Sequence, residues 1–396
     1  MKPPRLPGVL LPSYSPLVKV ALAVLASIGV LAQGRVASAA DMDPTPERLF
    51  MNPPGLPAGV GCQQVAANPE IVLHPPFPAS ASPNSYGCQP NNVAWANMMS
   101  ELGMAIAPTA FHPARTTGLG GFALSFEASY THINADATAG GVQYWHQGTQ
   151  GPIDPTTKQF SVVNTSPDSL LQIYSLKARK GLAYGFEVTG ALGYVANTSL
   201  WVGGGDLHWA ILEGYRTGFL GYLPDIAIGG GVRTLGGSPK LFLTTIGMDA
   251  QISKPFTLDD SAVVTPYLGA QRVIIFADSP VVDLAPNVDP LQQCGYEGTN
   301  VPGNPNGHAP FDGRPVCQNK LSNGADNNSA FNNDTTFQKA RIHRWRGIAG
   351  VNYKYEVLYL AAQFAFDMED PSDENANLGI TGARQWTTSL EAGVYF

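Results

Sequence analysis

The chain ends in the stretch Gln385-Trp386-Thr387-Thr388-Ser389-Leu390-Glu391-Ala392-Gly393-Val394-Tyr395-Phe396, in which two kinds of residue alternate. Trp386, Leu390, Val394 and Phe396 fall on one side, and Gln385, Ser389 and Glu391 fall on the other. Successive side chains of a β-strand point to opposite faces, so this pattern predicts a strand with one apolar and one polar face.

The same alternation recurs from residue 120 onward and predicts ten strands. They span about 120–132, 169–178, 182–195, 199–213, 223–234, 240–252, 262–276, 341–354, 356–367 and 384–396. The pattern leaves the facing of the strands at 169–178 and 262–276 open. A further hairpin within 141–164 would raise the count to twelve.

A soluble β-sandwich also alternates, so the pattern alone does not identify a membrane protein. These strands, however, are near the length that a tilted transmembrane strand needs. Their polar faces carry charges at mid-strand, and aromatic residues flank the apolar faces: Tyr130, Tyr194, Trp201, Trp345, Tyr353, Tyr355 and Trp386. The sequence therefore predicts an all-β fold, a closed antiparallel transmembrane β-barrel over residues 119–396.

The ending Leu390-Glu391-Ala392-Gly393-Val394-Tyr395-Phe396 resembles the last strand of Gram-negative outer-membrane β-barrel proteins. In that family the barrel-assembly machinery recognises a C-terminal Phe, so the resemblance implies that Phe396 is an assembly signal. It also implies a place in the outer membrane with the C-terminus in the periplasm. The long links at about 133–168, 277–340 and 368–383 then all fall on the outer side, as the family rule requires.

Composition and charge agree with an exported protein. The chain has 23 Lys and Arg against 30 Asp and Glu, a net charge of −7, which argues against nucleic-acid binding. Residues 1–40 combine Lys2, Arg5 and Lys19 with the apolar run Val20 to Ala32 and the small-residue site Ala37 to Ala40. Such a segment is typical of a secretory signal peptide, and its apolar run is too short to span a bilayer.

Residues 41–118 are rich in proline and contain one helical pattern, at about 92–107. Trp95, Met98, Met99 and Leu102 recur there at helical spacing and make one apolar face. We interpret this segment as a periplasmic structure, either a cap under the barrel, which we favour, or a plug inside it. The N-terminus is then periplasmic as well. In an oxidising compartment, Cys62 with Cys88 and Cys294 with Cys317 are the local disulfide pairing of three that are possible.

The polar faces of the strands supply the candidate functional residues. The predicted pore-lining residues are Glu127, Glu187, Asp206, His208, Asp225, Arg233, Asp249, Arg344, Arg346, Lys354 and Glu391. Asp367 faces the same way, and acidic residues outnumber basic ones in this set. We therefore predict a passive, cation-favouring pore for small solutes. The alternative is a closed barrel filled by paired charges, which displays its outer loops for adhesion or has a structural role.

Three weaker signals concern chemistry and partners. Asp206 and His208 share one face of a strand, a combination that omptin-like outer-membrane proteases also use, but no other catalytic spacing appears and we do not expect an enzyme. Arg341 and His343 face outward at the rim, where they could bind lipopolysaccharide phosphates. The acidic and Asn-rich outer loops offer oxygen ligands for Ca²⁺ without a recognisable calcium-loop spacing, so no cofactor is expected.

Overall fold

A computed structural model describes residues 42–46, 49–51, 89–109, 112–145, 167–214, 222–259, 261–283, 294–296, 315–317 and 334–396. The proposed signal peptide, residues 1–40, lies outside the described residues, as do Cys62 and Cys88.

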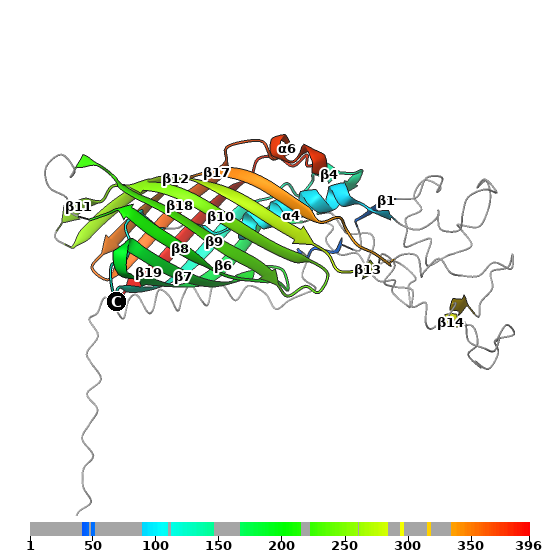
Figure 1. Ribbon diagram of the computed structural model, residues 1–396, viewed down its shortest axis with the longest axis horizontal. Helices are drawn as coiled ribbons and strands as arrows, with labels where there is room; N and C mark the ends of the chain where they lie inside the picture. The colour runs from blue at the N-terminus through cyan, green and yellow to red at the C-terminus, as the bar shows by residue number, and fades with distance from the viewer. Residues whose placement is uncertain are drawn as a thin grey trace, which may run out of the picture.

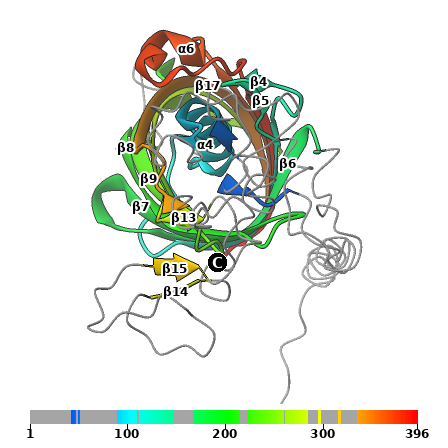
Figure 2. The ribbon, with the colours of Figure 1, turned by 90° about the vertical axis from the view of Figure 1, so that its right-hand side faces the viewer.

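Ten antiparallel strands form one closed barrel (Figures 1 and 2). In chain order they are β3 (Phe122–His132), β6 (Leu170–Gly181), β7 (Phe186–Val195), β8 (Trp201–Leu212), β9 (Asp225–Gly236), β10 (Phe242–Ser253), β12 (Ala262–Asp278), β17 (Ala340–Tyr355), β18 (Leu358–Asp367) and β19 (Trp386–Tyr395). Each pairs with its neighbour in this sequence, and β19 pairs with β3 to close the ring. The prediction of a ten-stranded barrel is confirmed, and each strand overlaps its predicted range.

The two ends of the barrel differ in their connections. One end, called here the loop end, carries the links that follow β3, β7, β9, β12 and β18. The other, called the turn end, carries the short links around η3 (Ala183–Gly185) and β11 (Phe256–Asp259), and also the C-terminus. In the loop after β3, the strands β4 (Thr138–Ala139) and β5 (Val142–Gln143) pair only with each other. They do not join the barrel wall, so the twelve-strand alternative is wrong for the described residues.

Smaller elements complete the loop end. The strand pairs there are β1 (Phe50–Met51) with β2 (Gln89–Pro90) and β13 (Val282–Asp283) with β16 (Asp334–Thr335). The strands β14 (Cys294–Tyr296) and β15 (Pro315–Cys317) form a further pair in the long link after β12. The helices α6 (Pro371–Glu374) and η6 (Ala376–Leu378) lie in the link after β18.

The barrel is apolar outside and charged inside, the reverse of a soluble protein. Leu176, Leu192 and Leu207 face outward and are 60%, 62% and 53% exposed. Their strand neighbours Lys177 and His208 face inward and are 5% and 2% exposed. A closed sheet with such a surface is the arrangement of a transmembrane barrel, because closure leaves no backbone edge unpaired in lipid.

Aromatic side chains gather near both rims of the outer surface. Tyr194 lies opposite Trp201 in the strand register close to the loop end. Near the turn end, the rings of Phe186 and Trp209 stack with their centroids 5.5 Å apart. Two such belts are expected where a barrel passes through the membrane interfaces. No α-helix in the described ranges has the length and apolar character that crossing a bilayer would require.

Helix α4 (Asn92–Ile106) lies inside the barrel, where Figure 2 shows it encircled by the strands. Asn91 caps its start, since its side-chain oxygen accepts a hydrogen bond from the Ala94 backbone N–H at 3.1 Å. Pro108 follows its end. From Ala94 to Ile106 every residue is buried, and the helix contacts β6, β9, β10 and β12. Of the two positions considered for this helix, the structure shows the one inside the barrel. The prediction that we favoured, a cap beneath the barrel, is wrong.

The N-terminal segment also runs in an unexpected direction. The backbone N–H of Met42 donates to the carbonyl of Asn197 at 3.1 Å, and that of Ser199 donates to Asp43 at 2.7 Å, both at the loop end. Residues 91–109 and 112–117 lie along the lumen and lead to the turn end, where β3 begins and Phe396 pairs with Phe122. Residues 42–51 and the C-terminus thus lie at opposite ends, so the prediction that both face the periplasm is wrong for these residues. The alternation of residues within strands does not reveal that residues 42–51 lie at the loop end, because the segment that crosses the lumen is not a strand.

Candidate functional site

The candidate site is the lumen, and it is filled by residues 91–117, called here the plug. Residues 110 and 111 of this segment lie outside the described ranges. The plug has two parts with different chemistry: helix α4 in the loop-end half, and a polar stretch without regular structure, residues 107–109 and 112–117, in the turn-end half. The helix packs against apolar side chains of the wall, and the polar stretch forms hydrogen bonds with polar side chains of the wall.

In the loop-end half, α4 packs in an apolar core. Trp95, Met98 and Met99 are fully buried, and the Trp95 ring stacks on Phe337 with centroids 4.9 Å apart. The barrel wall contributes apolar inward side chains from several strands: Ile173, Leu243, Val273, Ile275 and Ile342. At Gly103 the wall comes so close that an added Cβ would lie 2.4 Å from Ile275, so glycine is needed there. This half is sealed by close packing.

Glu101 fastens the loop after β3 onto the helix. Its carboxylate accepts hydrogen bonds from the Tyr144 hydroxyl and the Trp145 indole N–H, both at 2.7 Å, and from the Asn134 backbone N–H at 3.3 Å. Glu101 is buried, so its carboxylate depends on these donors. Tyr144 and Trp145 are themselves fully buried. A buried carboxylate therefore holds a loop across the loop end.

Asn97 does the same for the loop after β18. Its side-chain oxygen accepts from the backbone N–H groups of Thr381 at 2.9 Å and Gly382 at 3.0 Å. Its amide donates to the carbonyls of Gly379 at 3.2 Å and Val93 at 2.8 Å. With Glu101, it makes the helix the common support of two loops.

In the turn-end half, polar groups of the wall bind the plug's backbone. The carbonyl of Pro108 accepts from Gln271 at 3.1 Å and also from Arg346. The N–H of Ala114 donates to Ser253 at 3.0 Å, and its carbonyl lies 3.2 Å from the Nε2 atom of His208. The stretch passes through a polar barrel and takes its hydrogen bonds from it.

The last plug residues bind three acidic residues. The backbone N–H groups of Thr116 and Thr117 donate to Glu213 at 2.8 Å and Glu187 at 2.7 Å. Arg115 pairs with Asp225 at 3.2 Å. Glu187 and Asp225, expected to line a pore, thus hold the plug instead of facing open water.

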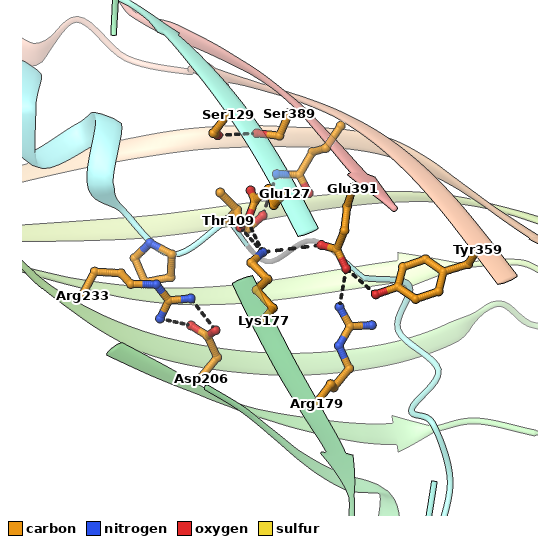
Figure 3. A network of polar contacts seen from close by, with 12 residues as sticks. Thr109, Glu127, Ser129, Lys177, Arg179, Asp206, Arg233, Tyr359, Ser389 and Glu391 are labelled. Atoms are coloured by element: carbon orange, nitrogen blue, oxygen red, sulfur yellow. Dashed lines mark hydrogen bonds and ion pairs between the residues drawn. The ribbon is translucent and has the colours of Figure 1, made fainter. Parts of the chain in front are cut away.

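The strand pair that closes the barrel brings two carboxylates together. Glu127 of β3 and Glu391 of β19 occupy directly opposed positions in the register, and both point inward. Like charges so placed repel each other. Figure 3 shows the compensation: Lys177 pairs with Glu127 and, at 3.5 Å, with Glu391, while Arg179 contacts Glu391 at 3.3 Å. We call Glu127, Lys177, Arg179 and Glu391 the seam cluster.

The seam cluster also touches the plug and the neighbouring wall. Lys177 donates to the hydroxyl of Thr109 at 2.8 Å, and that hydroxyl lies 3.3 Å from Glu127. Tyr359 donates its hydroxyl hydrogen to Glu391. One lysine therefore serves both the closure of the barrel and the docking of the plug.

A second buried pair joins β8 to β9. Arg233 binds Asp206 through two hydrogen bonds, at 2.9 Å and 2.6 Å (Figure 3). The Asp206 carboxylate occupies the space over Gly231, where an added Cβ would lie 1.9 Å from it. Asp249 accepts from Gln251 at 2.8 Å. The inward glycines of this wall make room for the carboxylates rather than for a water column.

The two remaining inward arginines also bind the plug. Arg344 binds Asp367, Gln385 and the carbonyl and hydroxyl of Ser100 on the helix. Arg346 binds Gln271 and the carbonyl of Pro108. Lys354, at the turn end, lies with its Nζ atom 4.7 Å from the centroid of the Tyr395 ring.

All eleven residues predicted to line a pore face the interior, but they do not line an open channel. The prediction that acidic residues outnumber basic ones left out three bases that also face inward: Lys177, Arg179 and Arg115. Two of them lie on β6, whose facing the sequence pattern leaves open, and the third lies on the plug. The cavity beside the end of α4, next to Thr109 and Lys177, has a volume of about 20 Å³, roughly the room for one water molecule.

The arrangement gives no support to a protease. Asp206 is bound by Arg233, whereas His208 faces the Ala114 carbonyl and the ring of His112, with centroids 4.1 Å apart. The two residues share a strand face without orienting each other. Asp249 accepts a hydrogen bond from Gln251 and is not hydrogen-bonded to either of them.

At the rim, Arg341 and His343 face outward. Arg341 lies over the Phe276 ring, 5.5 Å from its centroid, and the backbone of His343 is bound by Asn375. Arg272, which the sequence pattern did not assign, faces outward beside them over Trp345 and pairs with Glu374 at 3.0 Å. Binding of lipopolysaccharide at Arg341 and His343 stays a proposal.

The outer loops add two observations on predicted sites. Cys294 and Cys317 lie opposite each other in the β14–β15 pairing, the register that a bridge between them would use. Within the described ranges no three His, Cys, Asp or Glu residues gather in a way that could hold a metal ion. Asp370 caps α6, and hydrogen bonds from Ser372 lower its pKa. The Asn-rich stretch Asp326 to Asn333 lies outside the described residues.

Replacing Glu101 by Leu should loosen the loop after β3. Tyr144 and Trp145 would lose their acceptor while buried, which costs about 1–3 kcal/mol for each donor. Limited proteolysis and hydrogen exchange of residues 133–145 should both become faster. Glu369→Leu, a change at an exposed loop-end glutamate, is the matched control and should leave both unchanged. Equal exchange in the two variants would contradict the role given to Glu101.

Replacing Lys177 by Met should weaken the barrel seam. The change leaves Glu127 and Glu391 opposed with one cation fewer, and breaking a buried pair costs about 3–5 kcal/mol. We expect unfolding of the refolded protein at a lower urea concentration, and partial recovery in the double variant Lys177→Met with Glu391→Gln. Lys180→Met, on the exposed face of the same strand, should have little effect. Equal urea midpoints of unfolding in all of these variants would show that the pairing of β3 with β19 needs no cation.

Comparison with known proteins gives structural matches only. No family model matches the chain, and no curated protein does. Among solved structures, the attachment invasion locus protein Ail of Yersinia pestis matches with 10% identity over 70% of this chain and 99% of its own, with a TM-score of 0.22. The outer membrane protein OprG of Pseudomonas aeruginosa matches with 10% identity over 72% and 99%, with a TM-score of 0.22.

The N-terminal β-barrel domain of Pseudomonas aeruginosa OprF matches with 9% identity over 69% of this chain and 97% of its own, with a TM-score of 0.23. TM-scores this low carry no weight of their own, and the fold rests on the strand pairing described above. By that pairing, the chain is a closed ten-stranded antiparallel β-barrel with an apolar exterior and a lumen filled by its own residues.

Proposed function

We propose that this protein is an integral outer-membrane barrel that its own plug keeps closed, and that it acts through the structures displayed at its loop end. The observation that carries the proposal is the plug itself, which makes contacts along the lumen from Asn91 to Thr117. In this proposal the protein is an adhesion or structural protein of the cell surface, and it performs no catalysis.

The interior contacts favour a closed barrel over a passive pore. The loop-end half is packed with apolar side chains, and the described carboxylates of the turn-end half bind cations, amides or the plug's backbone. Passage of a solute would require both layers to separate. The pairing also weakens the basis for cation preference, because Lys177, Arg179 and Arg115 neutralise part of the inward acidic charge.

The loop end has the features of a display surface. Its loops are held by buried groups of α4, namely Glu101 and Asn97, and therefore have a fixed support. The N-terminal segment emerges at this same end. Long loops of bacterial barrels face outward, so we place the loop end outside the cell and the turn end in the periplasm.

A gated pore is the second candidate, and the polar half of the plug favours it. Residues 112–117 are held mainly by hydrogen bonds and one ion pair, which water can replace, whereas α4 is held by an apolar core. A stimulus that releases the whole plug would open a passage for small solutes.

Single-channel recording distinguishes the two candidates. The purified, refolded full chain should give no conductance steps in a planar bilayer, although the same sample migrates as a folded, heat-modifiable barrel. A variant without residues 42–117 that passes the same folding test should conduct, because the inner wall is then free of its plug. Steady steps from the full chain at neutral pH would overturn the closed-barrel proposal.

Epitope insertion tests the orientation. A tag placed before Met42 should bind antibody on intact cells, because this segment lies at the loop end. A tag inserted at Tyr184, which is 91% exposed at the turn end, should bind only after the outer membrane is permeabilised. If antibody on intact cells bound the tag at Tyr184 and not the tag before Met42, the proposed orientation would be wrong.

A further inference from the structure

A second cavity lies at the turn end, between the plug and the strands β12, β17 and β19. It has a volume of about 450 Å³, within the range of small-molecule sites. Its lining includes the plug residues Arg115 and Thr117 and the wall residues Thr265, Asn352 and Lys354. The closed-barrel proposal makes no use of this cavity.

The two charged side chains of the lining are both cationic, and the terminal carboxyl group of the chain, on Phe396, lies at the same cavity. Two cationic side chains, Arg115 and Lys354, line the cavity, and none of its lining side chains is a carboxylate. Arg115 is held in place by Asp225 at 3.2 Å. Lys354 is exposed, rests on the Tyr395 ring and is in no ion pair with a carboxylate among the residues that the structure describes. Its ammonium group is therefore available to a ligand.

A buried amide in the same lining lacks a partner. The side chain of Asn352 is 4% exposed, and its Nδ2 atom donates no hydrogen bond in the described part of the chain. The Thr117 hydroxyl is likewise buried without a partner there. Leaving one such group unpaired costs about as much as a lost hydrogen bond, so these groups mark a place where an acceptor binds.

We propose that this cavity is a binding site for a small soluble oxyanion, a carboxylate or a phosphate. The ammonium of Lys354 supplies the charge, and the buried Asn352 amide and Thr117 hydroxyl supply donors when their side chains turn toward the ligand. An ammonium, an amide and hydroxyls around one space match the several acceptor oxygens of such an anion. The site opens at the turn end, so the ligand reaches it from that side whether or not the barrel ever conducts.

Titration of the full chain in detergent micelles tests the site. Inorganic phosphate and succinate are the two probes, followed by calorimetry or by chemical-shift changes of labelled Asn352 and Lys354. We expect saturable binding of at least one probe, weakened by added chloride salt because the contact is charged. The probe that binds more tightly distinguishes phosphate from carboxylate ligands.

Two variants and one control make the test specific. Lys354→Met should weaken binding at least tenfold by removing the charge. Asn352→Leu should weaken it by removing the amide. Lys180→Met, which changes an outward lysine at the same end, should bind like the parent. Heat-modifiable migration on gels checks that each variant is folded. Absence of saturable binding, or equal binding by all folded variants, would overturn the proposal and leave water as the partner of Asn352.

Discussion

The pairing of β3 with β19 is the contact on which the rest of the structure depends. It closes the sheet, and in doing so it sets Glu127 against Glu391 in the interior. Closure is therefore stable only when cations stand between them, and β6 supplies Lys177 and Arg179 for this purpose. The hydroxyls of Ser129 and Ser389, 2.6 Å apart, and of Thr131 and Thr387, 2.9 Å apart, continue the same seam toward the loop end.

The seam in turn shapes the filling of the lumen. A barrel of ten strands encloses slightly more space than its own side chains fill, and this chain fills the space with a segment of its own. The segment changes character where the wall does. It is a helix of Trp, Met and Leu where the wall offers Ile, Leu and Val, and a chain without regular structure where the wall offers carboxylates and amides. Lys177 lies where the two halves meet and binds both wall and plug.

Much of this fold is present in the sequence as simple alternation. The ten strands follow from it, because a strand with one face in lipid and one in a polar interior must alternate, and Leu390 beside Glu391 is a typical case. The facing of β6 does not follow, because Leu176 and Lys180 share one of its faces while Ile173 and Lys177 share the other. With β6 unassigned, the two bases that balance the seam are missed and the interior looks acidic. The position of α4 is likewise beyond reach, since an apolar helical face packs equally well beneath a barrel or within one.

The crossing of the lumen by the plug has a consequence for how the molecule is assembled. The segment that fills the barrel comes first in the chain, and the strand that completes the barrel comes last. Once β19 has joined β3, the wall forms an uninterrupted ring around a polypeptide that enters at one end and leaves at the other. Helix α4 and its loops are broader than the stretch at Ala114, so the finished ring cannot easily be slipped onto them. An assembly in which the first segment lies along the open sheet before the final strand pairs avoids this threading.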